Sequence, residues 1–145
     1  MHIYLQNINT IHGFICRSTY YMKLRFSKNS VRLRLSKSEI NFLNENGQIF
    51  ETIQFGPNSS DQFNYGIIKS YTADYQFINS DNKFIVSLPE LDCTEWCSSE
   101  LVGLEKTINT EINPFHILLE KDFKCLTERL NEDESDNFEN PNSSC

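Results

Sequence analysis

The sequence predicts an α+β fold of mainly antiparallel β-sheet, barrel-like or rolled, with two short helices. Three observations support this fold class. A basic segment near the amino terminus alternates like a β-hairpin, a capping box directly after it begins a short helix, and the rest of the chain carries six further strand-like segments. Many short strands around few helices are typical of an α+β domain.

The basic segment spans residues 22–37 (MKLRFSKNSVRLRLSK) and predicts a hairpin with a two-residue turn at Lys28 and Asn29. Like charges that face each other across strands destabilise the pair, so this hairpin needs an anionic neighbour. Strand alternation separates its side chains into two faces. The apolar face holds Leu24, Phe26, Val31, Leu33 and Leu35, and the basic face holds Lys23, Arg25, Arg32 and Arg34.

A capping box follows the hairpin. Ser36 is the predicted N-cap, and Glu39, three residues later, can accept a hydrogen bond from the Ser36 amide. Leu35 and Ile40 form the accompanying hydrophobic staple, and Gly47 supplies the left-handed stop. These signals predict a helix over residues 37–45.

After this helix, the apolar residues recur with a period close to two, which indicates β-strands. Turn residues separate these segments, and Pro89 begins a second short helix that carries Cys93, Trp96 and Cys97. The predicted strands are residues 48–55, 62–71, 74–79, 83–88, 101–108 and 115–121.

Three regions follow from this organisation. Residues 1–21 lack a clear period and are predicted to be a non-native or disordered extension, with Met22 as the initiator; a genuine amino-terminal strand or arm is the alternative. Residues 22–126 form a single α+β domain. Residues 127–145 form an acidic arm, for which the hypothesis is an ordered segment from Asp122 to Pro141 that brings acids to Arg25, Arg32 or Arg34. The acids predicted near these arginines are Asp133, Glu134 or Asp136, and Asp122 is a further acid of the arm.

Charge and cysteine content limit the function classes. The basic segment holds six of thirteen Lys and Arg, whereas all twenty acids lie after it. The net charge of −7 argues against nucleic acid as the partner, and no apolar run approaches the roughly 20 residues of a membrane span. Five irregularly spaced cysteines favour a reducing compartment, so we expect a cytoplasmic protein. The Asn, Ile, Lys, Tyr and Phe bias suggests a bacterial origin.

No catalytic motif accompanies the basic face, which favours a binding or regulatory module over an enzyme. Its partner would be an acidic protein surface or a small phosphorylated ligand, because arginine forks suit oxyanions. The alternative without a binding function is a solvent-exposed sheet face whose charge the protein's own acids neutralise. The functional alternative is a metal-assisted enzyme on a phosphorylated or polyphosphate substrate, in which Arg32 and Arg34 hold phosphate and arm carboxylates hold Mg²⁺. Outside that alternative, no cofactor is predicted.

Both ends of the chain resemble a family of short uncharacterised bacterial proteins. The likeness lies in MKLRFSKNSVRLRLSKSEI at 22–40, LLEKDFKCL at 118–126 and EDESDNFENP at 132–141. The resemblance implies a start at Met22 and no particular activity, cofactor or partner. It further implies one shared constellation of Arg32, Arg34, Asp122, Cys125, Asp136, Asn140 and Pro141.

Overall fold

The structure is a computed structural model that describes residues 21–127 and 129–142. The prediction for residues 1–21 falls, except for Tyr21, outside these residues. Eight strands and two helices are present. They are β1 (Lys23–Ser27), β2 (Ser30–Leu35), α1 (Lys37–Asn46), β3 (Gln48–Gln54), β4 (Gln62–Ser70), β5 (Gln76–Ser80), β6 (Lys83–Pro89), α2 (Glu90–Ser98), β7 (Gly103–Ile108) and β8 (Phe115–Lys121).

The strands form two sheets, each made of two hairpins. Sheet A has the order β1-β2-β8-β7 and so joins the first and last hairpins of the chain, whereas sheet B has the order β3-β4-β6-β5. Within each sheet the two hairpins meet through one parallel pair, β2 with β8 and β4 with β6, and the other pairs are antiparallel. The predicted α+β class with two short helices is confirmed, although neither sheet closes into a barrel.

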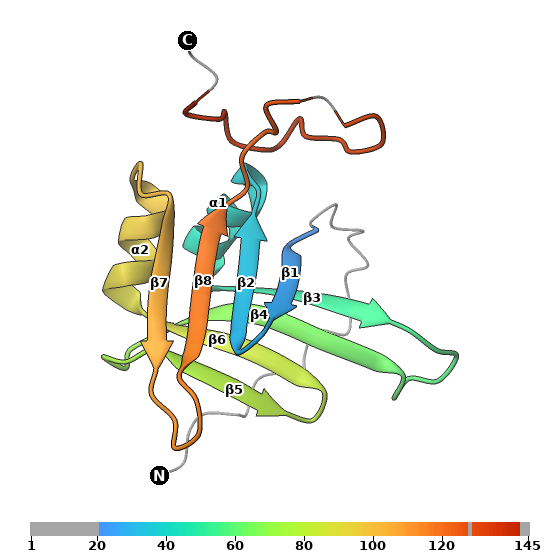
Figure 1. Cartoon of the computed structure of the whole chain (residues 1–145), viewed down its shortest axis with the longest axis vertical. Helices are drawn as coiled ribbons and strands as arrows, with labels where there is room; N and C mark the ends of the chain where they lie inside the picture. Colours follow the sequence, from blue (N-terminus) through green and yellow to red (C-terminus); the bar gives the residue numbers. More distant parts are fainter. Residues whose placement is uncertain (1–20, 128, 143–145) are drawn as a thin grey trace.

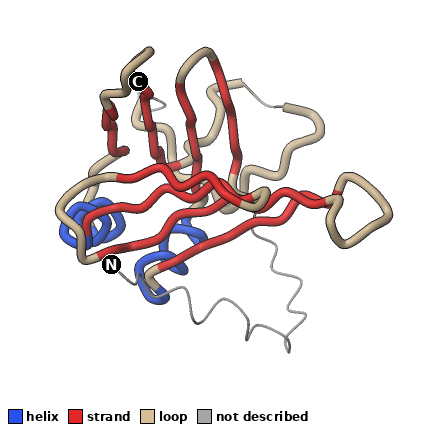
Figure 2. The backbone as a smooth tube through the Cα atoms, turned by 90° about the horizontal axis from the view of Figure 1, so that it is seen from below, coloured by secondary structure: helices blue, strands red, loops and turns tan. Residues whose placement is uncertain are grey.

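The strands of sheet A run across those of sheet B, and the helices lie behind sheet A (Figure 1). In both views the helices are remote from the loop between β3 and β4, which projects at the opposite end of sheet B (Figure 1; Figure 2). None of the helices in the described part of the chain is long and apolar enough to cross a membrane.

The first hairpin has the predicted register. Ser27 pairs with Ser30 and Arg25 with Arg32, and Lys28 in the turn has a left-handed φ of 52°. Val31, Leu33 and Leu35 of β2 are buried, as the alternation predicts, whereas Phe26 at the end of β1 stays 48% exposed. The apolar face of sheet A therefore points into the core and its basic face points outward.

The predicted capping box begins α1. Oγ of Ser36 accepts from the Glu39 amide, and the Glu39 carboxylate accepts from the Ser36 amide at 2.7 Å. At the other end Gly47 has a φ of 72°, and its amide donates to the carbonyl of Leu43. This left-handed conformation favours glycine because it has no Cβ.

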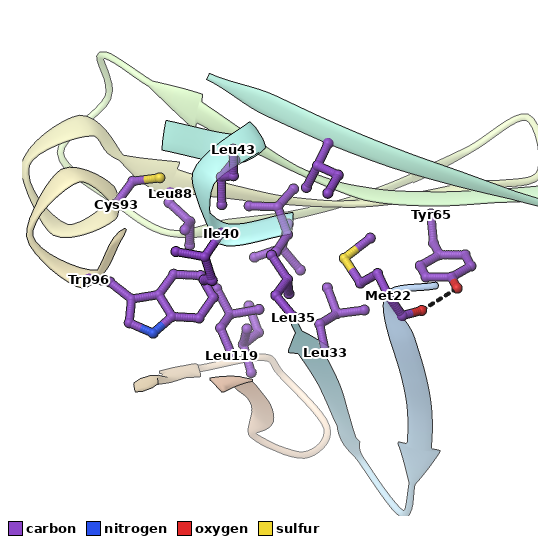
Figure 3. Packing of buried hydrophobic residues seen from close by; sticks show 14 of the residues in the cluster. Met22, Leu33, Leu35, Ile40, Leu43, Tyr65, Leu88, Cys93, Trp96 and Leu119 are labelled. Atoms are coloured by element: carbon purple, nitrogen blue, oxygen red, sulfur yellow. Dashed lines mark hydrogen bonds between the residues drawn. The ribbon is translucent and has the colours of Figure 1, made fainter. Parts of the chain in front are cut away.

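Most of the core lies between the two sheets and against the helices. Trp96 of α2, Ile40 and Leu43 of α1, Leu35 of β2 and Leu119 of β8 are all buried here (Figure 3). Sheet B contributes Leu88 of β6 and Ile67 of β4 to the core, and both are inaccessible to solvent.

Two predicted strands start later than expected. The strand predicted from residue 74 begins at Gln76, and the strand predicted from residue 101 begins at Gly103. Before β7, the carbonyl of Val102 accepts from both the Trp96 indole and the Lys121 amide, so tertiary contacts rather than a ladder occupy this part of the chain.

Replacing Ser36 by alanine is expected to lower the free energy of unfolding by about 0.5–2 kcal/mol. The substitution removes the acceptor for the Glu39 amide at the start of α1. Urea denaturation measures the change, and Ser59→Ala in the exposed loop between β3 and β4 is the matched control with no expected effect. Equal stability of the Ser36 variant and the parent would mean that the cap contributes nothing.

Candidate anion-binding face

The outward face of sheet A is an arginine cluster that no described helix covers (Figure 1). Arg25 of β1 lies directly opposite Arg32 of β2, and Arg34 follows on the same face. These three residues are called the arginine cluster below. Strand alternation aims their side chains away from the core, and the hairpin register sets the first two side by side.

One carboxylate forms ion pairs with two of these arginines. Oε2 of Glu120 on β8 lies 3.2 Å from Nε of Arg34 and 3.7 Å from Nε of Arg32. The parallel register of β2 with β8 places Glu120 opposite Arg34. Arg25 has no ion pair with any residue that the structure describes. The cluster therefore retains positive charge that its nearest carboxylate does not balance.

A small hollow lies within this cluster. Its volume is about 170 Å³, and Arg25 and Arg32 line it together with Ser27, Ser30 and Leu118. Oγ of Ser30 donates to the carbonyl of Ser27 at 2.6 Å, which fixes the hairpin end of the hollow. Two guanidinium groups and the hydroxyl of Ser27 around such a space can donate several hydrogen bonds to one oxyanion.

The carboxyl-terminal arm lies elsewhere, across the ends of β2 and β8 (Figure 1). Phe123 and Phe138 form a parallel bridge with ring centroids 5.9 Å apart, and backbone bonds tie the arm to the amide of Lys37 and the carbonyl of Leu35. Asn137 is buried. Residues 122–127 and 129–142 are called the arm below, and contacts at residues 122–124 and 136–138 hold the arm against the domain.

The predicted pairing of the arm's acids with the arginine cluster is wrong. Asp136 instead accepts from the Ser38 amide and hydroxyl, the latter at 2.9 Å, and so caps α1. Glu134 accepts from the amide of Cys125, and Asp133 from that of Ser135. Carboxylates at a helix start or a turn satisfy amides that lack other partners, and this local use keeps them away from the cluster.

One ion pair between the arm and the basic face of the hairpin is present. Nζ of Lys23 lies 2.7 Å from Oδ2 of Asp122, whose side chain is nearly buried. This ion pair joins β1 to the start of the arm. Because Asp122 balances the charge of Lys23, this lysine does not add to the excess positive charge of the arginine cluster. The anion-binding candidates are thereby reduced from four cations to the arginine cluster.

The predicted family constellation is divided between two places. Arg32 and Arg34 belong to the outer face of sheet A, whereas Cys125 and Asn140 lie in the arm. Nδ2 of Asn140 donates to the carbonyl of Lys124 at 3.0 Å, and a hydrogen bond to Glu134 raises the pKa of the Cys125 thiol. Pro141 lies beside Asn140 at the rim of a larger cavity.

That larger cavity has a volume of about 630 Å³ and lies between the arm and the ends of the two helices. Lys121, which the sequence analysis did not single out, is buried at its wall. Its Nζ donates to the carbonyl of Ser99 at the end of α2 and lies 5.4 Å from the Phe138 ring centroid. These contacts give the ammonium group a structural role, because cations stabilise helix carboxyl ends.

Three of the cysteines, Cys93, Cys97 and Cys125, lie in the described part of the chain. Cys93 and Cys97 share one face of α2, and the hydrogen bond between their thiols lowers the pKa of Cys93 and raises that of Cys97. Among the residues with described positions, no group of three His, Cys, Asp or Glu side chains is arranged to hold a metal ion.

Glu120 was not predicted from the sequence as the partner of Arg32 and Arg34, since only the parallel pairing of β2 with β8 brings it beside them.

The fold and the face together define a small two-sheet α+β protein with an outward arginine cluster. Residues 22–142 match the model of a family of unknown function, DUF7009, and the chain belongs to that family. The resemblance to an uncharacterised family is thus confirmed. Comparison with curated proteins and with solved structures gives no match.

Proposed function

We propose that this protein is a binding module of the bacterial cytoplasm whose arginine cluster holds an oxyanion, phosphate or carboxylate, of its partner. The observation that carries the proposal is the position of Arg25, which faces Arg32 across the hairpin and has no ion pair among the described residues. Keeping two guanidinium groups adjacent destabilises the free protein, and an anion held between them would offset this repulsion.

The size of the hollow favours a single anionic group. About 170 Å³ accommodates one phosphate or carboxylate and little more, so the rest of the ligand would lie on the open sheet face. The exposed setting makes the interaction dependent on salt, because surface charges are screened within about 8 Å at physiological ionic strength. An acidic protein surface and a small phosphorylated ligand share this chemistry, and experiment distinguishes them.

The metal-assisted enzyme remains the alternative prediction. It requires arm carboxylates beside Arg32 and Arg34, whereas Asp136 caps α1 and Glu134 binds the Cys125 amide. No observation among the described residues favours it over the binding module.

Replacing Arg25 by glutamine is expected to weaken anion binding about tenfold, the effect of losing roughly 1.4 kcal/mol of charge-assisted hydrogen bonding. The same change should raise the free energy of unfolding by about 0.2–1 kcal/mol, because it removes a like-charge pair. Calorimetric titration at low salt with pyrophosphate and with a glutamate-rich peptide measures binding, and the ligand with the larger loss identifies the source. Urea denaturation measures stability.

The matched control is Lys83→Gln on sheet B, which should leave binding of both ligands unchanged. Equal affinities of the parent and the Arg25 variant for both ligands would refute the proposal. A loss of stability in the Arg25 variant would show that its guanidinium has a structural role instead.

A further inference from the structure

Two acidic side chains, one buried and one half-buried, lie beside the backbone of residues 21 and 22, away from the arginine cluster. Glu39 of α1 is 1% exposed, and Glu51 of β3 stands opposite Tyr65 of β4. The hydroxyl of Tyr65 donates to the carbonyl oxygen of Met22 at 2.5 Å (Figure 3). Met22 is 2% exposed and belongs to the core, so its backbone is held in place beside Glu51, and Glu39 lies near enough to act on Glu51.

Neither carboxyl group has a matching cation. Oε1 of Glu39 and Oε1 of Glu51 are both buried, and neither has a hydrogen-bond partner in the described part of the chain. The other oxygen of Glu39 accepts from the Ser36 amide. No ion pair between described residues includes either acid. Buried charges are normally paired, so two buried carboxyl oxygens without a partner point to an absent cation or to bound protons.

The titration of the site reflects this lack of positive charge. Burial, with a further contribution from Glu39, raises the pKa of Glu51 to about 7. Burial also raises the pKa of Glu39. The pKa of Tyr65 rises to about 12, first through burial and then through the two acids. The amides of Met22 and Tyr21 act in the opposite direction, because hydrogen bonds from them lower the pKa values of Glu51 and Glu39 respectively.

The other charged groups nearby do not supply the cation. Asp136 of the arm adds negative charge beside Glu39 and raises its pKa. Lys23, the residue after Met22, is engaged with Asp122. The backbone nitrogen of Met22 is therefore the donor best placed to serve the site.

We propose that Glu39 and Glu51 form a binding site for a primary ammonium group, and that its ligand is the α-ammonium of Met22 in a polypeptide that begins at this residue. An amide at Met22 offers the site one N–H and no charge. An α-ammonium offers three N–H groups and a positive charge, enough for the free oxygens of both acids. The family match also begins at residue 22.

The two forms of the chain should respond to pH in opposite ways. When residues precede Met22, Glu51 has a folded pKa of about 7, above its unfolded value of 4.5, so stability is lost as pH rises between these values. When the chain begins at Met22, the ammonium keeps the carboxylates ionised at neutral pH. Its own stabilisation should then last until the pH passes the raised pKa of the ammonium group.

Thermal melting of three chains between pH 5 and 8.5 tests the site. They are the 145-residue chain, a chain that begins at Met22, and the same chain with Gly-Ser before Met22. Intact mass must show that Met22 is retained. At pH 8 we expect the Met22 chain to melt several degrees above the Gly-Ser chain, which has an amide in the site but is otherwise matched. Melting of these two within 1 °C at pH 8 would overturn the proposal.

Glu51→Gln in the Met22 and Gly-Ser chains provides the sharper comparison. At pH 8 it should lower the melting temperature of the Met22 chain by several degrees, because it removes a partner of the ammonium group. In the Gly-Ser chain it should raise the melting temperature or leave it unchanged, because an uncharged amide replaces a carboxylate without a cation. An equal fall in melting temperature in both chains would mean that Glu51 has only a structural role, and the proposed site would be rejected. A fall in the melting temperature of the Met22 chain with EDTA would identify a metal ion instead.

Discussion

Removal of the arm by truncation after Lys121 is expected to lower the free energy of unfolding by about 4 kcal/mol. The half-buried rings of Phe123 and Phe138 contribute most of this, because each large apolar side chain is worth about 1.5–3 kcal/mol when fully buried. Loss of Asp136 removes the acceptors for the Ser38 and Lys37 amides and adds about 1 kcal/mol. Chemical denaturation followed by circular dichroism measures the change.

Two controls separate the role of the arm from a general effect of truncation. A chain ending at Asn142 keeps every described arm contact and should be as stable as the parent. Asp136→Ala keeps the arm but removes the side-chain cap, so it should lose about 1 kcal/mol and leave pyrophosphate affinity unchanged within about twofold. A chain truncated after Lys121 that melted within a few degrees of the parent would show that the arm does not stabilise the domain.

Trp96→Ala is expected to destabilise the protein by about 3–5 kcal/mol, since it opens a large cavity at the junction of α2 with both sheets. The indole lies in the core and is inaccessible to solvent (Figure 3). Its Nε1 donates to the carbonyl of Val102 at 3.3 Å. Because Trp96 is the single tryptophan of the chain, circular dichroism rather than fluorescence should follow unfolding.

The matched variant is Trp96→Phe, which removes the indole N–H and leaves most of the ring volume filled. It should cost about 1–2 kcal/mol, less than the alanine substitution. Equal losses in the two variants would mean that the hydrogen bond to Val102, rather than packing, accounts for the contribution of this residue.

Local features of the fold could be predicted from the sequence because residues close in the chain determine them. The register around Lys28 and Asn29 follows from a two-residue turn, and the start of α1 follows from reciprocal bonds between Ser36 and Glu39. The parallel pairing of β2 with β8 could not be predicted in this way. It joins segments about 85 residues apart, and no local pattern encodes which strands become neighbours.

The same limit applies to the candidate site. Alternation along the hairpin predicts that Arg25 and Arg32 share an outward face, and the structure places them there. The source of their counter-charge was mispredicted because it depends on tertiary arrangement. Glu120 reaches the cluster through the parallel pair, whereas Asp136 is committed to the start of α1.

The central claim is that the arginine cluster binds an oxyanion, and the arginine side-chain Nε–Hε signals of ¹⁵N-labelled protein test it most directly. During a pyrophosphate titration at low salt, the signals of Arg25 and Arg32 should shift along a common saturable curve. The signal of Arg129, which is paired with Glu132 in the arm, should stay nearly constant. Shifts of equal size at all arginines without saturation, or an unchanged signal at Arg25, would contradict the claim.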